Sequence, residues 1–146
     1  MHVWRISNHA DLSGRGGFLA DGRWHRKGVS VVYCADHPSS TLLEMLVHVD
    51  PEDVPASFQL LMINLPDDVA VVQPDLPTNW ADQNAVTQAL GMDFLQNTPG
   101  PAMRVPSALV PFAWNYILNP GTMERSGIRI VGVSRHPIDR RLLGLR

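Results

Sequence analysis

Residues 29–47 read VSVVYCADHPSSTLLEMLV and contain two different patterns of apolar residues. Its first part, Val29–Cys34, is an apolar and β-branched run bounded by turn-forming residues, a pattern typical of a buried strand. Its second part opens at Pro38 and places leucine, methionine and valine around Glu44 until Asp50-Pro51 ends the run. This second pattern is typical of an amphipathic helix. The stretch therefore predicts a buried strand followed closely by a helix.

The rest of the chain adds short strands and one further helix. Apolar runs predict strands at residues 3–6, 58–63, 69–72 and 128–133, and a helix at residues 84–96 in which Gly91 is a weak point. Prolines divide residues 99–120 into short extended pieces. Many short strands with two modest helices indicate an α+β fold. We expect a compact single domain over residues 1–146, with short and mostly antiparallel strands.

Composition excludes several classes of protein. The 146 residues carry 12 Lys+Arg against 14 Asp+Glu, a net charge of -2, so we expect no surface for direct nucleic-acid binding. The single cysteine, Cys34, excludes an internal disulfide and fits a reducing compartment. The N-terminus lacks the pattern of a signal peptide, and no apolar run reaches membrane-spanning length. These features predict a cytoplasmic protein without membrane contact.

Common cofactor and catalytic motifs are weak. The run Gly14–Gly17 neither follows a predicted strand nor has the spacing of a dinucleotide fingerprint, and we interpret it as a mobile loop. Cys34 and His37 have the gap of half a metal site, but no second pair completes it. We therefore expect no metal and interpret Cys34 as a buried thiol. No serine stands in the G-x-S-x-G sequence of α/β-hydrolases.

Three side chains, Arg23, Tyr33 and Glu44, interrupt the predicted turn, strand and helix. A permanently charged guanidinium, an aromatic ring and a carboxylate are suited to binding a phosphate-bearing nucleotide and to stabilising a cationic sugar transition state. Each also has a purely structural interpretation. Arg23 could stack on Trp24 at the surface, Tyr33 could be a core tyrosine with a satisfied hydroxyl, and Glu44 could close a capping box with Thr41.

Several stretches stand in an order and spacing that is far more specific than any one of them. They are Trp4-Arg5-Ile6-Ser7, Gly22-Arg23-Trp24-His25 with Gly28, Val31-Val32-Tyr33, Leu43-Glu44-Met45-Leu46-Val47-His48, and Val105-Pro106-Ser107-Ala108 leading to Asn115-Tyr116-Ile117-Leu118-Asn119-Pro120. In these stretches the chain resembles the RES-domain family over nearly its whole length. The resemblance implies an ADP-ribosyltransferase-like fold and a NAD⁺-consuming toxin of a RES/Xre toxin–antitoxin system. Many members carry asparagine where this chain has His25.

The resemblance also implies a role for each matched residue. Arg5 and Arg23 would clamp the pyrophosphate or the adjoining ribose of NAD⁺, because a bidentate guanidinium fits phosphate better than an ammonium does. Tyr33 would stack on the nicotinamide ring. Glu44 would accept a hydrogen bond from a ribose hydroxyl and stabilise the oxocarbenium-like ribose as nicotinamide leaves. Ser107 would orient that ribose, or the glutamate, through its hydroxyl.

Two enzymatic outcomes remain open within this resemblance. In the first, ADP-ribose passes to water or a small acceptor, which depletes NAD⁺. In the second, ADP-ribose is transferred to a cellular protein. Leu42 stands two residues before Glu44, and because its side chain cannot align or deprotonate a guanidinium, arginine is disfavoured as the acceptor. A third interpretation is a nucleotide-binding module that has lost its chemistry, and the complete set of matched residues argues against it.

The resemblance further implies a protein partner, an Xre-like helix-turn-helix antitoxin. We expect it to obstruct the cleft around Arg5, Arg23 and Glu44 and to supply the DNA contacts that the near-neutral chain cannot make. The basic C-terminal stretch could contribute to the attraction or could be a solvated tail. Its basic residues are Arg135, Arg140, Arg141 and Arg146.

Overall fold

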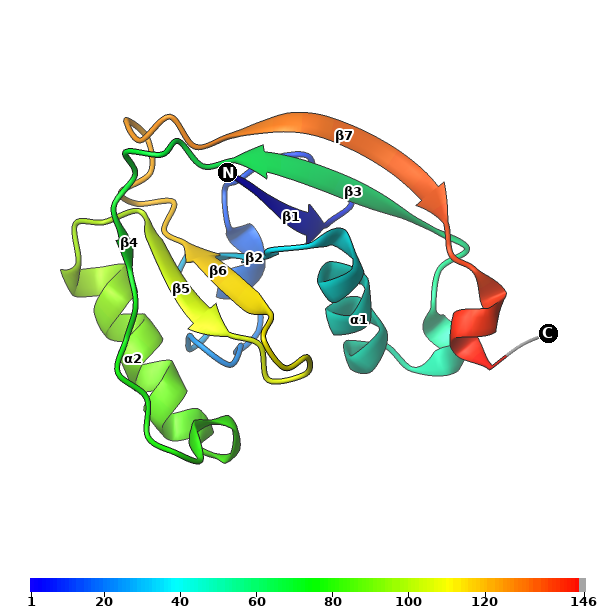
Figure 1. Ribbon diagram of the computed structural model, residues 1–146, viewed down its shortest axis with the longest axis horizontal. Helices are drawn as coiled ribbons and strands as arrows, with labels where there is room; N and C mark the ends of the chain where they lie inside the picture. Colours follow the sequence, from blue (N-terminus) through cyan, green and yellow to red (C-terminus); the bar gives the residue numbers. More distant parts are fainter. Residues whose placement is uncertain (145–146) are drawn as a thin grey trace.

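The computed structural model describes residues 1–144, in which the chain forms a seven-stranded sheet and two α-helices. The helices are α1, Pro38–His48, and α2, Asn84–Asn97. The strands are β1 His2–Ile6, β2 Val32–Ala35, β3 Ser57–Asn64, β4 Val71–Val72, β5 Ala102–Pro106, β6 Trp114–Leu118 and β7 Arg129–Pro137. The predicted α+β fold is confirmed (Figure 1). Among these residues no helix is long and apolar enough to cross a bilayer.

The sheet consists of two parts that meet at β1. Its order is β4-β5-β6-β2-β1-β3-β7, and all pairs are antiparallel except β4 with β5. Strand β1 pairs with β3 along its whole length, whereas within residues 1–144 it meets β2 at one register position, Trp4 opposite Ala35. The long β3–β7 ribbon therefore separates from the β2–β6–β5 part and arches over α1 (Figure 1).

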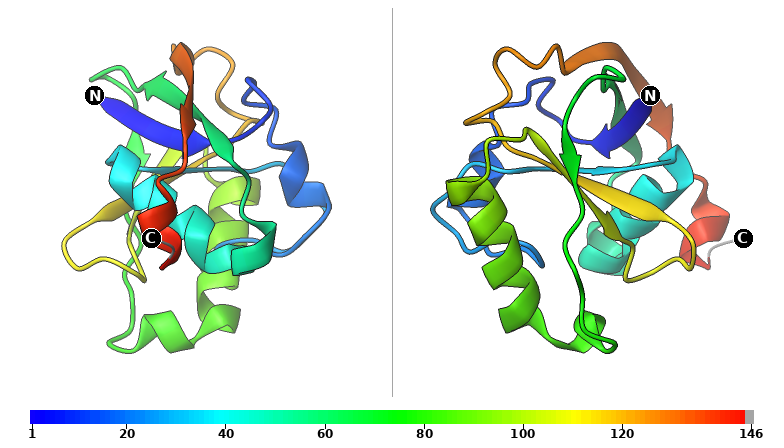
Figure 2. Two further views of the ribbon diagram at one scale, coloured as in Figure 1. Left: turned by 90° about the vertical axis from the view of Figure 1, so that its right-hand side faces the viewer. Right: turned by 60° about the vertical axis from the view of Figure 1, so that its left-hand side comes forward.

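Alternating side chains of β2, β5 and β6 contribute to two hydrophobic cores. One core joins Cys34 and Leu118 to Val3, Leu61 and Ile63 of β1 and β3. The other core joins Met103 and Ile117 to Trp24 and to Phe94 of α2. Helix α2 thus covers the β4–β5–β6 end of the sheet, apart from α1, which packs against β1 and β2 (Figure 2). The cleft described below lies between these two helices.

The glycine-rich run is not the free loop that the sequence suggests. Val31 N–H donates to Gly14 O at 3.3 Å, and Gly28 N–H donates to Gly17 O at 3.0 Å. An added Cβ at Gly17 would lie 2.1 Å from Val29 O, so only glycine permits this contact. Gly28 and Val31 are therefore bonded to the run instead of the sheet, and β2 begins at Val32 and not at Val29 as predicted.

Gly91 also has a packing reason that the sequence does not reveal. A Cβ at this position would lie 1.6 Å from Trp24 O, because α2 crosses directly over that carbonyl. The predicted weak point of the helix is thus the place where α2 approaches residues 22–25 most closely. Gly91 therefore weakens the helix locally but is also required for the close contact with Trp24.

The short extended pieces predicted for the proline-divided segment include strands β5 and β6, where Pro106 ends β5 and the loop of residues 107–113 connects it to β6. Two further boundaries differ from the prediction. Strand β4 begins at Val71 and not at residue 69. Strand β7 continues to Pro137, beyond the predicted end at residue 133, because it pairs with β3 as far as Ser57. In the C-terminal stretch, Arg135 donates to Ser57 Oγ and Arg141 pairs with Asp139. Arg146 lies outside the described residues.

Candidate functional site

A cleft of about 790 Å³ lies between α1, the start of α2, β2 and the loop connecting β5 to β6. It brings together Arg5, Arg23, Tyr33 and Glu44, which are far apart in the sequence. Ser107 does not line the cleft, although the next two residues of its loop do. Four of the five sequence-predicted site residues therefore share one cavity.

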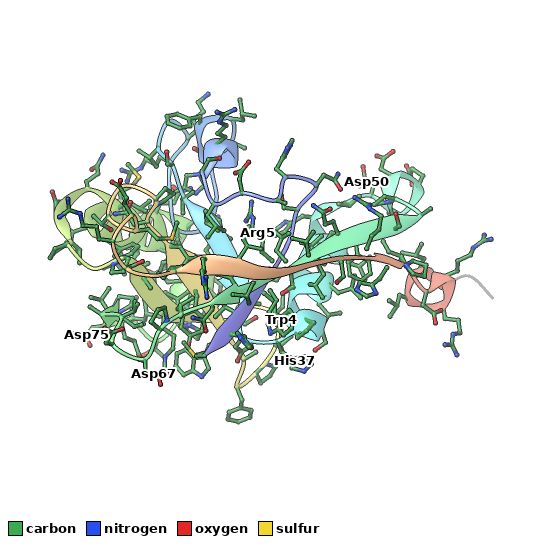
Figure 3. All side chains as sticks on the ribbon, turned by 90° about the horizontal axis from the view of Figure 1, so that it is seen from above. Trp4, Arg5, His37, Asp50, Asp67 and Asp75 are labelled. Carbon is green, nitrogen blue, oxygen red and sulfur yellow. The ribbon has the colours of Figure 1, made fainter. Side chains whose placement is uncertain are left out.

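Arg5 reaches the cleft from β1. Its Nη1 donates to Tyr33 O at 3.0 Å, which fixes one corner of the guanidinium against the neighbouring strand. Figure 3 shows Arg5 and Trp4 extending from β1 toward opposite sides, as the alternation of a strand requires. Within residues 1–144 the Arg5 guanidinium pairs with no carboxylate, so its charge is available to a ligand.

Arg23 lies in a tight turn, residues 22–25, that we call the Arg23 turn. The turn is closed by Gly22 N–H donating to His25 O at 3.1 Å. Helix α2 clamps it from outside, because Thr87 Oγ1 donates to Arg23 O at 2.7 Å and Gln88 Nε2 donates to Gly22 O at 3.1 Å. These three hydrogen bonds thus fix the backbone from which the Arg23 side chain extends.

The Arg23 guanidinium is fixed at one nitrogen. Its Nη1 donates to Ala81 O at 2.8 Å and to Asn84 Oδ1 at 3.4 Å. Its centre lies 5.8 Å from the ring of Trp80, in the 3-10 segment η3 (Trp80–Asp82). The alternative interpretation, in which Arg23 stacks on Trp24 at the surface, is wrong, because Trp24 is buried in the core that includes Phe94 of α2. In the described part of the chain, Arg23 also pairs with no carboxylate.

Tyr33 contributes its ring to the cleft and its hydroxyl to the Arg23 turn. The hydroxyl accepts the Trp24 N–H at 3.2 Å and lies 2.7 Å from His25 Nδ1. Burial raises the pKa of the Tyr33 hydroxyl, which therefore stays protonated and donates to His25 Nδ1. The hydrogen bonds of the hydroxyl are thus satisfied inside the protein, as expected for a core tyrosine. Tyr33 nevertheless also lines the cleft.

The tautomer of His25 follows from the same hydrogen bonds. Because Nδ1 accepts the Tyr33 proton, we assign the neutral tautomer with its proton on Nε2. Nε2 is buried and has no hydrogen-bond partner in the described residues. Gly22 allows this packing, since a Cβ there would lie 2.4 Å from the Tyr33 hydroxyl oxygen. The sequence left the role of His25 open, and its partner Tyr33 could be identified only from the fold.

Glu44 faces the cleft from α1. The helix begins at Pro38, and His37 caps it by accepting the Ser39 N–H. Glu44 is nearly two turns inside the helix, too far to bond to its N-cap, so the capping-box interpretation is wrong. Instead, Glu44 Oε1 accepts a hydrogen bond from Asn115 Nδ2 at 3.2 Å, and Oε2 lies 3.9 Å from His48 Nε2.

Ser107 has a local structural contact in the loop after β5. Its Oγ accepts the N–H groups of Leu109 and Val110, both at 3.1 Å, and its own N–H donates to Ala113 O. These bonds form a compact turn that places Ala108 and Leu109 at the cleft. In this structure the hydroxyl thus shapes the loop, and no described contact connects it with Glu44.

Asn115 is the functional candidate that sequence reasoning did not assign. It stood within a stretch quoted for the family resemblance, but its partner is 71 positions away in the chain.

Two other kinds of catalytic group do not fit this structure. Burial raises the pKa of the Cys34 thiol to about 12, so it is not a thiolate nucleophile. No group of three His, Cys, Asp or Glu side chains among residues 1–144 is placed to hold a metal ion.

The cleft therefore combines complementary chemistry. Two guanidinium groups can bind an anion, an aromatic ring can cover a planar heterocycle, and a carboxylate can accept from a hydroxyl or stabilise a cation. This combination suits a substrate that carries phosphate, a flat ring and a sugar.

Comparison with known proteins gives consistent results. A family model described as RES domain matches residues 2–139. The chain is 47% identical to "Toxin Res" of Pseudomonas putida over 133 residues, which cover 89% of this chain and 92% of that protein. It is 32% identical to "Prs ADP-ribosylating toxin" of Sphingobium sp. over 153 residues, which cover 96% of this chain and 95% of that protein.

A solved structure shows the same fold at low sequence identity. It is a chain from the crystal structure of the M. tuberculosis MbcT–MbcA toxin–antitoxin complex, with a TM-score of 0.69 and 16% identity. The match covers 98% of this chain and 86% of that chain. The arrangement of strands and helices is therefore shared well beyond recognisable sequence similarity.

Proposed function

The chain belongs to the RES-domain family, and from this premise we propose that it is the toxin of a toxin–antitoxin pair and cleaves the bond between nicotinamide and ribose in NAD⁺. One observation supports this most strongly. The Arg5 and Arg23 guanidinium groups, both without a carboxylate partner within residues 1–144, line the same cleft as the Glu44 carboxylate. An anionic ligand with a reactive cationic centre would satisfy both ends of such a cleft.

The proposed roles follow from these positions. Arg5 and Arg23 each have one nitrogen committed to a carbonyl, which leaves the remaining N–H groups for the pyrophosphate. The Tyr33 ring covers the nicotinamide. When the glycosidic C–N bond breaks, its electron pair leaves with nicotinamide, and positive charge develops on the ribose. Glu44 stabilises that charge, and water then adds to the ribose carbon and releases a proton.

Transfer of ADP-ribose to a protein is the second candidate. The relative from Sphingobium is named "Prs ADP-ribosylating toxin", and transfer of ADP-ribose to an acceptor other than water fits that name. Arginine remains a disfavoured acceptor, because Leu42 on α1 offers no group to align or deprotonate it. Another acceptor side chain is compatible with the cleft. Bond cleavage at the ribose and the role of Glu44 are the same for either acceptor.

The proposed partner is a helix-turn-helix antitoxin that covers the cleft. An enzyme that consumes a central cofactor must be kept inactive in the cell that makes it. Complex formation should therefore abolish NAD⁺ cleavage, and operator DNA should bind the complex but not the isolated chain, whose net charge is -2. A complex that cleaves NAD⁺ as fast as the free chain would contradict this arrangement.

One experiment distinguishes the two outcomes. The purified chain is incubated with NAD⁺ labelled in its adenylate part, alone and with cell lysate, while nicotinamide release and label transfer to protein are followed. Release without labelled protein supports hydrolysis, and a labelled band supports protein modification. If neither release nor labelling occurs, the proposed NAD⁺ chemistry is wrong.

A further inference from the structure

Asn115 connects the sheet to the Glu44 carboxylate. It lies in β6, opposite Ala35 of β2 on one side and Val105 of β5 on the other, so its backbone is fixed by hydrogen-bonded strands on both sides. From there its Nδ2 donates to Glu44 Oε1 at 3.2 Å. Within residues 1–144 this is the one hydrogen bond recorded for the Glu44 side chain.

The other end of the Asn115 amide is unusual. Its Oδ1 is buried and has no partner in the described part of the chain. Turning the amide over would not help, because Oδ1 would then face the Glu44 carboxylate, oxygen against oxygen. An unsatisfied buried acceptor disfavours folding. The contact with Glu44 is therefore kept at some cost to stability.

Asn119, just after β6, shows what a structural asparagine looks like in this protein. Its Nδ2 donates to Leu95 O at 3.0 Å and its Oδ1 accepts the Gly121 N–H at 3.0 Å, so both ends of the amide are satisfied. Asn115 has only one satisfied end, and that end contacts the carboxylate in the cleft. The difference separates an amide that serves the fold from one that serves Glu44.

His48 is a weaker support for Glu44. It lies 3.9 Å from Oε2, one turn along the same helix, and its side chain is 77% exposed. An exposed i,i+4 pair contributes little and is screened by salt. His48 also moves with α1, so it cannot fix Glu44 relative to the sheet that carries Tyr33.

We infer that Asn115 is a positioning residue that holds Oε1 of Glu44 and so directs Oε2 toward the substrate ribose. This inference rests on the proposed NAD⁺ cleavage. The hydrogen bond spans from β6 to α1 and keeps the carboxylate in one rotamer relative to Tyr33 and Arg5. Misplacement of a catalytic group by about 1 Å is enough to lower turnover by orders of magnitude.

The first test replaces Asn115 by leucine, which has a similar volume and no polar atoms. We expect kcat for nicotinamide release to fall by about tenfold or more, KM to stay within about threefold, and Tm to stay equal or rise. A purely structural role predicts instead a lower Tm with a normal kcat in the folded fraction, and that result would overturn the inference.

The second test uses Asn115→Asp. Aspartate has the same shape as asparagine, so this variant still tests the inference if Asn115→Leu does not fold. A second carboxyl group beside Glu44 disfavours the ionised pair, so the acid limb of the kcat profile should move up by about one pH unit or more. Asn8→Asp is the matched control, because Asn8 is exposed, bonds to Arg135 and lies outside the cleft. An Asn115→Asp profile identical to that of the control would contradict the inference.

A measurement without NAD⁺ separates this inference from the proposed function. The chain has three glutamates, Glu44, Glu52 and Glu124, so ¹³C labelling of their carboxyl carbons gives a simple spectrum. In Asn115→Asp only the Glu44 resonance should titrate at higher pH, with exposed Glu52 and Glu124 as internal references. An unchanged Glu44 resonance would overturn the inference. A shifted Glu44 resonance in Asn115→Asp, combined with a wild-type protein that releases no nicotinamide, would refute the proposed function and leave the contact between Asn115 and Glu44 intact.

Discussion

The two walls of the cleft are built in different ways. The Arg23 turn is fixed by hydrogen bonds between side chains and its backbone: the Tyr33 hydroxyl accepts the Trp24 N–H, and Thr87 and Gln88 donate to backbone carbonyls of the turn. Glu44, on the opposite wall, depends on one side-chain hydrogen bond from Asn115 and otherwise lies on a partly exposed helix face. Substitutions at the contacts that hold the Arg23 turn should therefore change folding and binding together. Substitutions in the second wall should change the chemistry and leave the fold intact.

The largest expected effect is that of Glu44→Gln, which tests the second wall. Glutamine keeps the shape and can still accept from Asn115, but it removes the charge that stabilises the ribose cation. Turnover should fall by a factor on the order of 10² or more, with little change in Tm. Nicotinamide release by the purified variant, together with a thermal melt, measures both. A folded Glu44→Gln protein with near-normal release would remove Glu44 from the mechanism.

The next effect tests the first wall at Gly91. In Gly91→Ala the new Cβ would meet Trp24 O at 1.6 Å, so α2 must move away from the Arg23 turn. We expect a loss of about 1–3 kcal/mol in the free energy of unfolding, accompanied by weaker NAD⁺ binding. Gly16→Ala is the control, since a Cβ there meets nothing within 4 Å. Equal stability of the two variants in urea titrations would show that α2 does not clamp the turn.

Tyr33→Phe removes the hydroxyl that serves the Arg23 turn and keeps the ring that faces the cleft. It leaves Trp24 N–H and His25 Nδ1 without their partner, at a cost of about 1–2 kcal/mol in unfolding free energy. Tyr116→Phe is the matched control, because within residues 1–144 its hydroxyl makes only a 3.5 Å contact with Met1 Sδ. For NAD⁺ binding, Tyr33→Ala should be weaker than Tyr33→Phe if stacking dominates. The reverse order in a titration would assign the effect to the hydroxyl.

The smallest effect is expected for Arg23→Lys. The charge remains, but an ammonium cannot make a planar two-point contact with phosphate, so the Kd for NAD⁺ should rise by about tenfold. Stability should be unchanged, since the Arg23 turn is held through its backbone. Arg26→Lys, an exposed change just after the same turn, is the reference. Equal Kd values for the two variants would return Arg23 to a surface role.

Local sequence patterns predicted the elements well and their contacts poorly. The buried strand and α1 were foreseen because apolar periodicity is a local property, and the α+β class followed from it. The pairing of Asn115 with Glu44, the cap of α1 by His37 and the packing of Gly91 on Trp24 all depend on tertiary geometry. Glu44 was assigned through the family resemblance, and the structure places it in the cleft, while its catalytic role stays a prediction.

Ser107 shows that a residue role implied by a family resemblance is not always visible in the contacts of the structure. The sequence placed it with the catalytic residues, and the structure places its hydroxyl in the turn after β5, where it accepts two backbone N–H groups. Its proposed role toward ribose therefore stays a prediction. The loop it shapes does reach the cleft through Ala108 and Leu109.

The most direct test of the whole account is a crystal structure of the Glu44→Gln variant with NAD⁺ bound. We expect the pyrophosphate beside Arg5 and Arg23, the nicotinamide against Tyr33, and a hydroxyl of the nicotinamide ribose within hydrogen-bond distance of residue 44. NAD⁺ bound elsewhere on the protein, or bound here with its nicotinamide ribose remote from residue 44, would contradict the proposed NAD⁺ cleavage.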